Sequence, residues 1–180
     1  MTVESSLLEP NLYSVKGIAI LDNDGNRIFA KYYNETFGSV KDQKTFERNL
    51  FNKTHRANGE VIMLDGFTCI YRNSVDLFFY IMGNANENGL ILNSIMNCLF
   101  ESLSHILKKN VEKKTLLENL DMVILALDEI CDGGIYLESD PIAIVQKVTA
   151  NKMDDLPFNE QTVAQVLQSA REQIKWSLLR

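Results

Sequence analysis

Residues that build covalent or metal-bound frameworks are scarce in this chain. Its 180 residues include three cysteines and two histidines. Cys69, Cys98 and Cys131 are odd in number, far apart and set among apolar residues, which predicts reduced core thiols rather than a disulfide framework. Neither His55 nor His105 is followed four residues later by a cysteine or a carboxylate that could complete a metal site. The sequence therefore predicts no cofactor and no metal.

A surplus of positive charge and a long apolar run are also lacking. The formal net charge is −6, which argues against nucleic acid as a partner and against simple electrostatic binding to anionic lipid. No apolar run approaches the roughly 20 residues of a membrane span, and the first residues do not have the pattern of a signal peptide. We expect a cytoplasmic protein that reaches membranes only peripherally, through protein partners.

Sequence motifs of catalysis are missing as well. No GxxxxGK[ST], GxGxxG, GxSxG or HExxH pattern occurs, so phosphate cradling, acyl transfer and zinc proteolysis have no support. The DNDG stretch at residues 22–25 starts like a calcium loop, but its glycine stands fourth instead of sixth. We interpret it as a turn and the chain as a non-catalytic protein.

What the chain does contain is a strong hairpin pattern over residues 15–33. An apolar run ends in the DNDG turn and returns as a second run with partial alternation, which predicts two paired strands. Because the first run is almost continuously apolar, we place this hairpin at the centre of a sheet. Strands are further predicted at 60–64, 67–72 and 74–82, which gives a five-stranded antiparallel sheet.

Helical periodicity occupies most of the remaining sequence. A helix with one narrow apolar face is predicted at 41–51 with Ser39 as its N-cap, followed after the sheet by apolar helices at 90–107 and 111–131. Ser139 and Asp140 before Pro141 mark the start of another helix at 142–150. We divide the chain into a leader (1–11), an α+β domain (12–150), a linker (151–158) and an amphipathic C-terminal helix (159–180).

Several motifs in this arrangement carry a resemblance to a known family. They are AILDNDGNRIFAKYY at 19–33, FNKTHR at 51–56, YRNSVDLFFY at 71–80, NENGLILNSIMNCLFESL at 86–103, LDEICDGGIYLESDP at 127–141 and EQTVAQVLQSAREQIKWSLLR at 160–180. The chain resembles the longin-like small (sigma) chains of clathrin adaptors and, more closely, the zeta subunits of the coatomer, the COPI coat complex. FNKTHR and the final motif separate zeta from sigma.

The resemblance implies a subunit of the COPI vesicle coat that pairs with the trunk of the coatomer gamma subunit. It further implies recruitment by an Arf-family GTPase to the cytosolic face of Golgi membranes, for retrograde transport to the endoplasmic reticulum and within the Golgi. Cargo tails would be met only indirectly. In sigma chains an arginine of the second strand helps to hold dileucine signals, but here Ile28 stands at that place and Arg27 precedes it, on the opposite strand face.

Two expectations about the interface and the function complete the sequence analysis. For contact with gamma we select aromatic residues that a lone domain would expose, namely Phe37, Phe46, Phe51 and Tyr71. The alternative function is a free-standing longin-type trafficking regulator, either SNARE-like or a GTPase-regulatory scaffold. A small α/β enzyme would require clustered titratable groups, whereas those of this chain are scattered.

Overall fold

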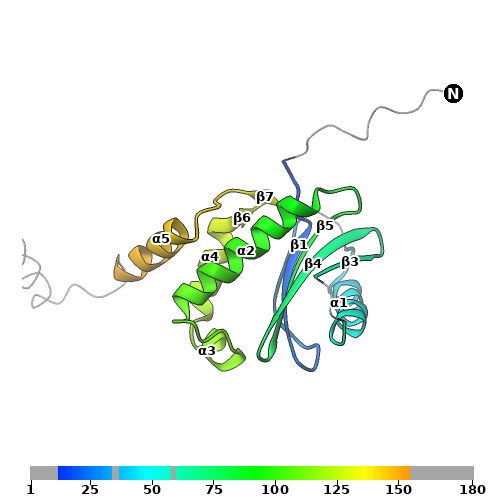
Figure 1. Cartoon of the computed structure of the whole chain (residues 1–180), viewed down its shortest axis with the longest axis horizontal. Helices are drawn as coiled ribbons and strands as arrows, with labels where there is room; N and C mark the ends of the chain where they lie inside the picture. Colours follow the sequence, from blue (N-terminus) through cyan, green and yellow to red (C-terminus); the bar gives the residue numbers. More distant parts are fainter. Residues whose placement is uncertain (1–11, 34–36, 58–59, 155–180) are drawn as a thin grey trace, which may run out of the picture. The chain divides into compact units, whose positions relative to one another are not determined.

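The computed structural model describes residues 12–33, 37–57 and 60–154. Residues 1–148 belong to one compact unit and residues 149–180 to a second, so the last helix begins in the first unit and ends in the second. In the first unit, a sheet carries α1 on one face and α2 with α4 on the other (Figure 1). None of the helices in the described part of the chain is long and apolar enough to cross a membrane.

In the described ranges, five strands form one antiparallel sheet in the order β2-β1-β5-β4-β3. The strands are β1 (Gly17–Asp22), β2 (Arg27–Tyr32), β3 (Val61–Leu64), β4 (Phe67–Ser74) and β5 (Leu77–Asn84). The predicted five-stranded sheet is confirmed, but the central placement of the first hairpin is wrong. β5 is the central strand and β2 is an edge, because β1 pairs on its other side with β5.

The DNDG stretch is a turn closed by its own first side chain. The Asp22 carboxylate accepts hydrogen bonds from the backbone N–H of Asp24 (3.0 Å) and of Asn26 (2.8 Å). Gly25 has a φ of +76°, which glycine adopts without steric cost. The other Asp22 oxygen lies 2.8 Å from the Lys113 ammonium, so the carboxylate joins the hairpin turn to the start of α3.

The first helix, α1 (Val40–Thr54), begins at the predicted cap. The Ser39 hydroxyl accepts a hydrogen bond from the N–H of Asp42 (3.2 Å), as expected of an N-cap serine. The helix runs three residues beyond the predicted end at position 51. Its buried side chains include Phe46, Leu50 and Thr54, spaced by four residues, so a single stripe of the helix rests on the sheet.

The opposite face is covered by α2 (Gly89–Ile106) and α4 (Leu120–Ile130), while α3 (Lys113–Glu118) connects them. The expectation of one helix over residues 111–131 is wrong, because the chain breaks at Asn119, whose φ of −123° is not helical. The side-chain amide of Asn119 donates to the carbonyl of Thr115 (2.8 Å). Asparagine competes in this way with backbone hydrogen bonding, which accounts for the break.

A two-stranded hairpin of β6 (Cys131–Asp132) and β7 (Ile135–Tyr136) follows α4 and holds the entry to β1. The Val15 N–H donates to the carbonyl of Gly134 (3.0 Å), whose φ is +86°. A Cβ added at Gly134 would lie 2.6 Å from the Val15 carbonyl oxygen, so this close approach requires glycine.

The last described helix, α5 (Pro141–Asp154), has the predicted start. The Asp140 carboxylate accepts a hydrogen bond from the N–H of Ile142 (2.9 Å), and Pro141 occupies the first helical position. The helix extends past position 150, so the first residues of the predicted linker are helical. The leader (1–11) and the predicted terminal helix (159–180) lie outside the described residues.

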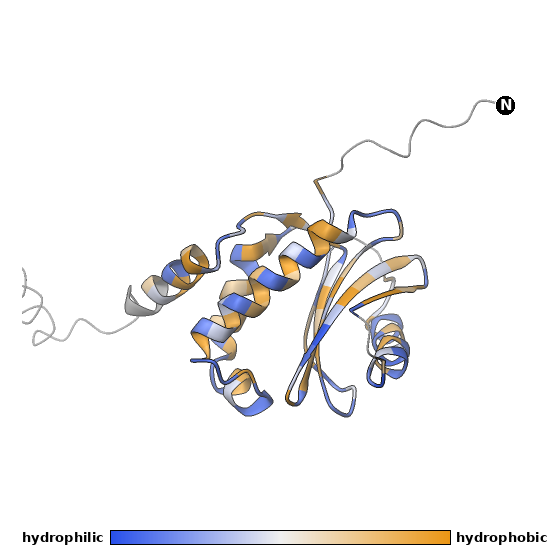
Figure 2. Ribbon diagram, in the orientation of Figure 1, coloured by the Kyte–Doolittle hydropathy of each residue, from blue (hydrophilic) through white to orange (hydrophobic). Residues whose placement is uncertain are grey.

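Two hydrophobic clusters lie on the two faces of the sheet, and Figure 2 shows the apolar residues along its strands. The larger cluster packs α2 and α4 against β1 and β5, with Ile20, Phe79 and Leu99 among its members. The smaller cluster lies under α1 and includes Phe46 and Tyr80. Cys69, Cys98 and Cys131 are free and buried in or beside these clusters, as predicted for core thiols.

Candidate partner interface

The four aromatic residues predicted to contact a partner lie together under α1. Phe37 packs on Phe46 with ring centroids 5.1 Å apart, and Tyr71 stacks on Tyr80 at 6.1 Å. Phe46, Phe51 and Tyr71 are buried and Phe37 is half-buried. The expectation that a lone domain exposes these rings is wrong, because α1 turns its aromatic residues towards the sheet. Their contact with a partner stays a prediction.

A buried ion pair fixes α1 to the hairpin. The Glu47 side chain is 3% exposed, and its carboxylate accepts from the Arg27 guanidinium at 2.7 and 2.9 Å. The Tyr32 hydroxyl donates to the same carboxylate (2.7 Å). Burial, together with the hydrogen bond and the charge of Glu47, raises the pKa of Tyr32 far above its usual range. These bonds satisfy a carboxylate that would otherwise be costly to bury.

Arg27 and Ile28 lie on opposite faces of β2, as the sequence predicts. The Arg27 side chain is held on the α1 face by Glu47, while Ile28 packs against the larger cluster on the α2 face. The position that an arginine occupies in sigma chains is therefore apolar here. The charged residue of β2 on this side of the sheet is Lys31, whose ammonium lies 2.6 Å from the Asp128 carboxylate of α4.

An exposed apolar depression lies where the start of α2 meets β7 and the chain leading into β1. Its volume is about 480 Å³, and we call it the α2 groove; its lining residues are Leu12, Ser14, Leu90, Ile91, Ser94, Ile135 and Tyr136. Leu90 is 79% exposed and Leu12 is 73% exposed. Leu137, which follows β7, is exposed as well. A group of large exposed apolar side chains is typical of an interaction surface.

Sequence reasoning missed the α2 groove, although a signal for it was present. Leu90 follows the N-cap Asn88, whose side chain accepts from the Leu90 N–H (2.9 Å). The buried residues of α2 begin at Leu92, so the core does not explain an apolar pair in the first turn of the helix. Ile91 is the second member of that pair.

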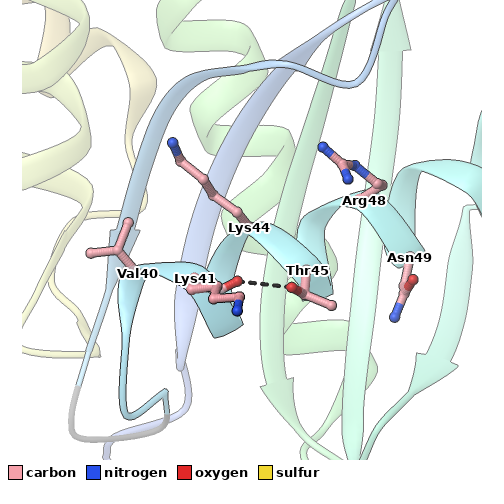
Figure 3. A pocket seen from close by; sticks show the side chains of 6 residues that line it. All are labelled: Val40, Lys41, Lys44, Thr45, Arg48 and Asn49. Atoms are coloured by element: carbon pink, nitrogen blue, oxygen red, sulfur yellow. Dashed lines mark hydrogen bonds between the residues drawn. The ribbon is translucent and has the colours of Figure 1, made fainter.

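The outer side of α1 is basic. Lys41, Lys44 and Arg48 line a shallow depression of about 460 Å³ together with Val40, Thr45 and Asn49 (Figure 3). Lys53 and Arg56 continue the exposed cations beyond it. We call the surface formed by these five cations the basic face. The described residues contain no group of three or more potential metal ligands.

Comparisons with known proteins agree with this architecture. Residues 14–155 match the family of clathrin adaptor complex small chains. Over 178 residues, the chain is 59% identical to the human protein named coatomer subunit zeta-1, with 99% of this chain and 100% of that protein covered. The chain belongs to the clathrin adaptor small-chain family, in its coatomer zeta branch.

Other members of the zeta branch are similar over most of their length. Human coatomer subunit zeta-2 is 58% identical, with 97% of this chain and 82% of that protein covered. Arabidopsis thaliana coatomer subunit zeta-1 is 39% identical, with 92% and 97% covered. A chain in a structure described as a homology model of the full-length AP-3 complex gives a TM-score of 0.62 at 17% identity, with 84% and 98% covered, and supports the adaptor small-chain fold alone.

Proposed function

We propose that this member of the zeta branch is a non-catalytic subunit of the COPI coat that pairs with the trunk of the coatomer gamma subunit. The observation that carries the proposal is the 59% identity to coatomer subunit zeta-1 along essentially the whole of both chains. The coat works in Golgi-to-ER retrograde and intra-Golgi vesicle transport. The expected location is the cytosolic face of Golgi membranes and COPI vesicles, with the Arf-family GTPase and cargo tails as indirect partners.

The α2 groove is the surface that best suits pairing with gamma. Leu12 and Leu90 expose most of their side chains, and Ile91 adds further apolar area in the same depression. Covering such side chains contributes about 25 cal/mol for each Å² of apolar surface removed from water. A permanent coat subunit needs an interface of this apolar kind. The buried rings Phe37, Phe46, Phe51 and Tyr71 are proposed to support the α1 side of the interface from beneath.

Leu90→Asp tests the groove without threatening the fold. Residue 90 lies in the first turn of α2, where an acidic side chain interacts favourably with the helix dipole. After co-expression with a tagged gamma trunk, we expect capture of the Leu90→Asp chain to fall about tenfold or more, since a buried carboxylate replaces an apolar contact. Capture is measured against the wild-type chain at equal expression.

Val75→Asp is the matched control. Val75 is 84% exposed, lies outside the groove and has a φ of +42°, a conformation that aspartate tolerates better than valine. It should be captured like the wild-type chain. Equal capture of Leu90→Asp would remove the groove from the interface, whereas a wild-type chain that does not bind the gamma trunk would overturn the pairing itself.

A further inference from the structure

Within the residues that the structure describes, no acidic side chain neutralises the basic face of α1. Its five cations are all exposed, and the printed sequence places two acidic residues in the same helix. Asp42 faces the helix N-terminus beside Ser39, and Glu47 is turned inward to Arg27. None of the five cations makes an ion pair with any residue in the described ranges. The positive charge of the basic face is therefore exposed to solvent and accessible to a binding partner.

Lys44 and Arg48 are the centre of this surface. They line the depression drawn in Figure 3, where Thr45 lies between Lys44 and Arg48 and Asn49 lies beyond Arg48. The same two side chains also border a second depression of about 260 Å³ beside the hairpin turn, with Gly25, Asn26, Arg27 and Glu47 as its other lining residues. Lys44 and Arg48 therefore contribute to the lining of both depressions. The exposed amide of Asn49 adds a donor and an acceptor next to them.

Two anionic partners could fit a surface of this charge, and the structure favours a protein segment over a membrane. The chain as a whole carries a net charge of −6, so the surface outside α1 is repelled by an anionic bilayer. Val40 is the single large apolar side chain in the depression, which leaves almost nothing to insert between lipids. A short acidic segment meets only the basic face and avoids that repulsion.

We propose that the basic face of α1 binds an acidic, extended segment of a partner protein, with Lys44 and Arg48 as its main contacts. The cations from Lys41 to Lys53 span about 18 Å along the helix. An extended chain covers that distance with about six residues. The basic face is separate from the α2 groove, because the groove lies at the start of α2 and not on α1.

The test uses the full chain and a fluorescent peptide of about six alternating Glu and Asp residues. Fluorescence anisotropy should show binding at low salt that weakens steeply as salt is added. The double substitution Lys44→Gln with Arg48→Gln should weaken binding about two- to thirtyfold, as expected for the loss of two exposed ion pairs. A peptide of the same length made of Gln should not bind.

The control is Lys108→Gln with Lys114→Gln, which removes the same charge from exposed positions outside α1. It should leave the affinity within about twofold of wild type, since these cations lie beyond the reach of a peptide on α1. Equal weakening by both double variants would overturn the proposal, because net charge alone would then explain binding. Sedimentation with phosphatidylserine-containing vesicles that depends on Lys44 and Arg48, without peptide binding, would overturn it in favour of a membrane.

Discussion

The two faces of the sheet are packed by different means. On the α2 face, two helices cover a cluster whose buried members in the described residues are mostly aliphatic. On the α1 face, a single helix covers a cluster rich in rings, among them Phe46, Phe51, Phe78 and Tyr80. Polar groups are also buried there, since Glu47 and Thr54 are each almost inaccessible.

The difference between the aliphatic and the aromatic cluster shows how a single helix can be fixed on a broad sheet. Two helices bury enough aliphatic surface to fix each other by shape. One helix of about 10 Å diameter leaves space at its flanks, which large rings fill. Its rotation is then set by directional bonds, from Glu47 to Arg27 and from Thr54 to Tyr80. The outer side of α1 is thereby free to carry charge.

The largest expected effect on stability comes from disturbing side-chain packing on the α2 face. Leu99 is 1% exposed and lies within the larger cluster. Leu99→Ala should lower the free energy of unfolding by about 2–5 kcal/mol, through lost burial and the cavity left behind. Urea unfolding measures the loss. Leu125→Ala on the outer side of α4, where Leu125 is 39% exposed, should cost less than half as much; equal costs would contradict the tight packing of this face.

The next effect concerns the buried ion pair on the α1 face. Glu47→Gln keeps the shape but removes the charge that Arg27 and Tyr32 bind, so unfolding free energy should fall by about 1–3 kcal/mol. Thermal or urea unfolding provides the value. Glu101→Gln, at an exposed position of α2, is the control and should be nearly neutral. A Glu47→Gln protein as stable as wild type would show that rings alone hold α1.

A smaller effect is expected from the second directional bond. The Thr54 hydroxyl lies 2.7 Å from that of Tyr80 and 2.8 Å from the Leu50 carbonyl oxygen. Thr54→Val leaves the Tyr80 hydroxyl buried without this partner and should cost about 1 kcal/mol. Thr45→Val makes the same chemical change on the exposed side of α1, where the hydroxyl donates to the Lys41 carbonyl. If both variants unfold at the same urea concentration, the bond to Tyr80 does not orient the helix.

The smallest effect should appear as a dependence on pH. Burial disfavours the charged Asp22 side chain, but the hydrogen bonds from Lys113 and the turn N–H groups outweigh it and hold its pKa below the ordinary 3.8. This stabilisation is fully present above pH 3.8 and is lost as the pH falls through the lower folded-state pKa.

Asp22→Asn isolates that charge, because the amide oxygen can still accept the turn hydrogen bonds. The variant should be slightly less stable than wild type at pH 7, and the gap should close in strongly acidic solution. Unfolding curves recorded along a pH series test this. A gap that is constant with pH would mean that the Lys113 contact adds no stability.

Local sequence patterns predicted most of the helices and strands. The order of the strands in the sheet depends on pairing between distant segments, which local patterns do not show. Continuous apolar runs identified β1 and β5, and the caps Ser39 and Asp140 marked the starts of α1 and α5. The edge position of β2 could not be read locally, since it follows from the pairing of β1 with β5. The break at Asn119 depends on one side-chain bond within an otherwise helical pattern.

The candidate surfaces were harder to predict than the fold. An aromatic residue in an amphipathic helix can face either the core or a partner, and Phe46 and Phe51 face the core. The α2 groove is assembled from segments far apart in the sequence, so no single stretch shows it. The basic face, by contrast, is local, since Lys41, Lys44 and Arg48 recur at helical spacing.

The contact of Gly134 with Val15 has a consequence for how the chain folds during its synthesis. The two residues are far apart in the sequence of the first unit, and their backbone hydrogen bond closes a loop of the chain that contains all five strands of the described sheet. The Tyr33 hydroxyl adds a second closure by donating to the Cys131 carbonyl (2.9 Å). A chain leaving the ribosome cannot complete the surroundings of its first strand until residue 134 has emerged, so a nascent chain that stalls before this point leaves the first strand without its closing contact.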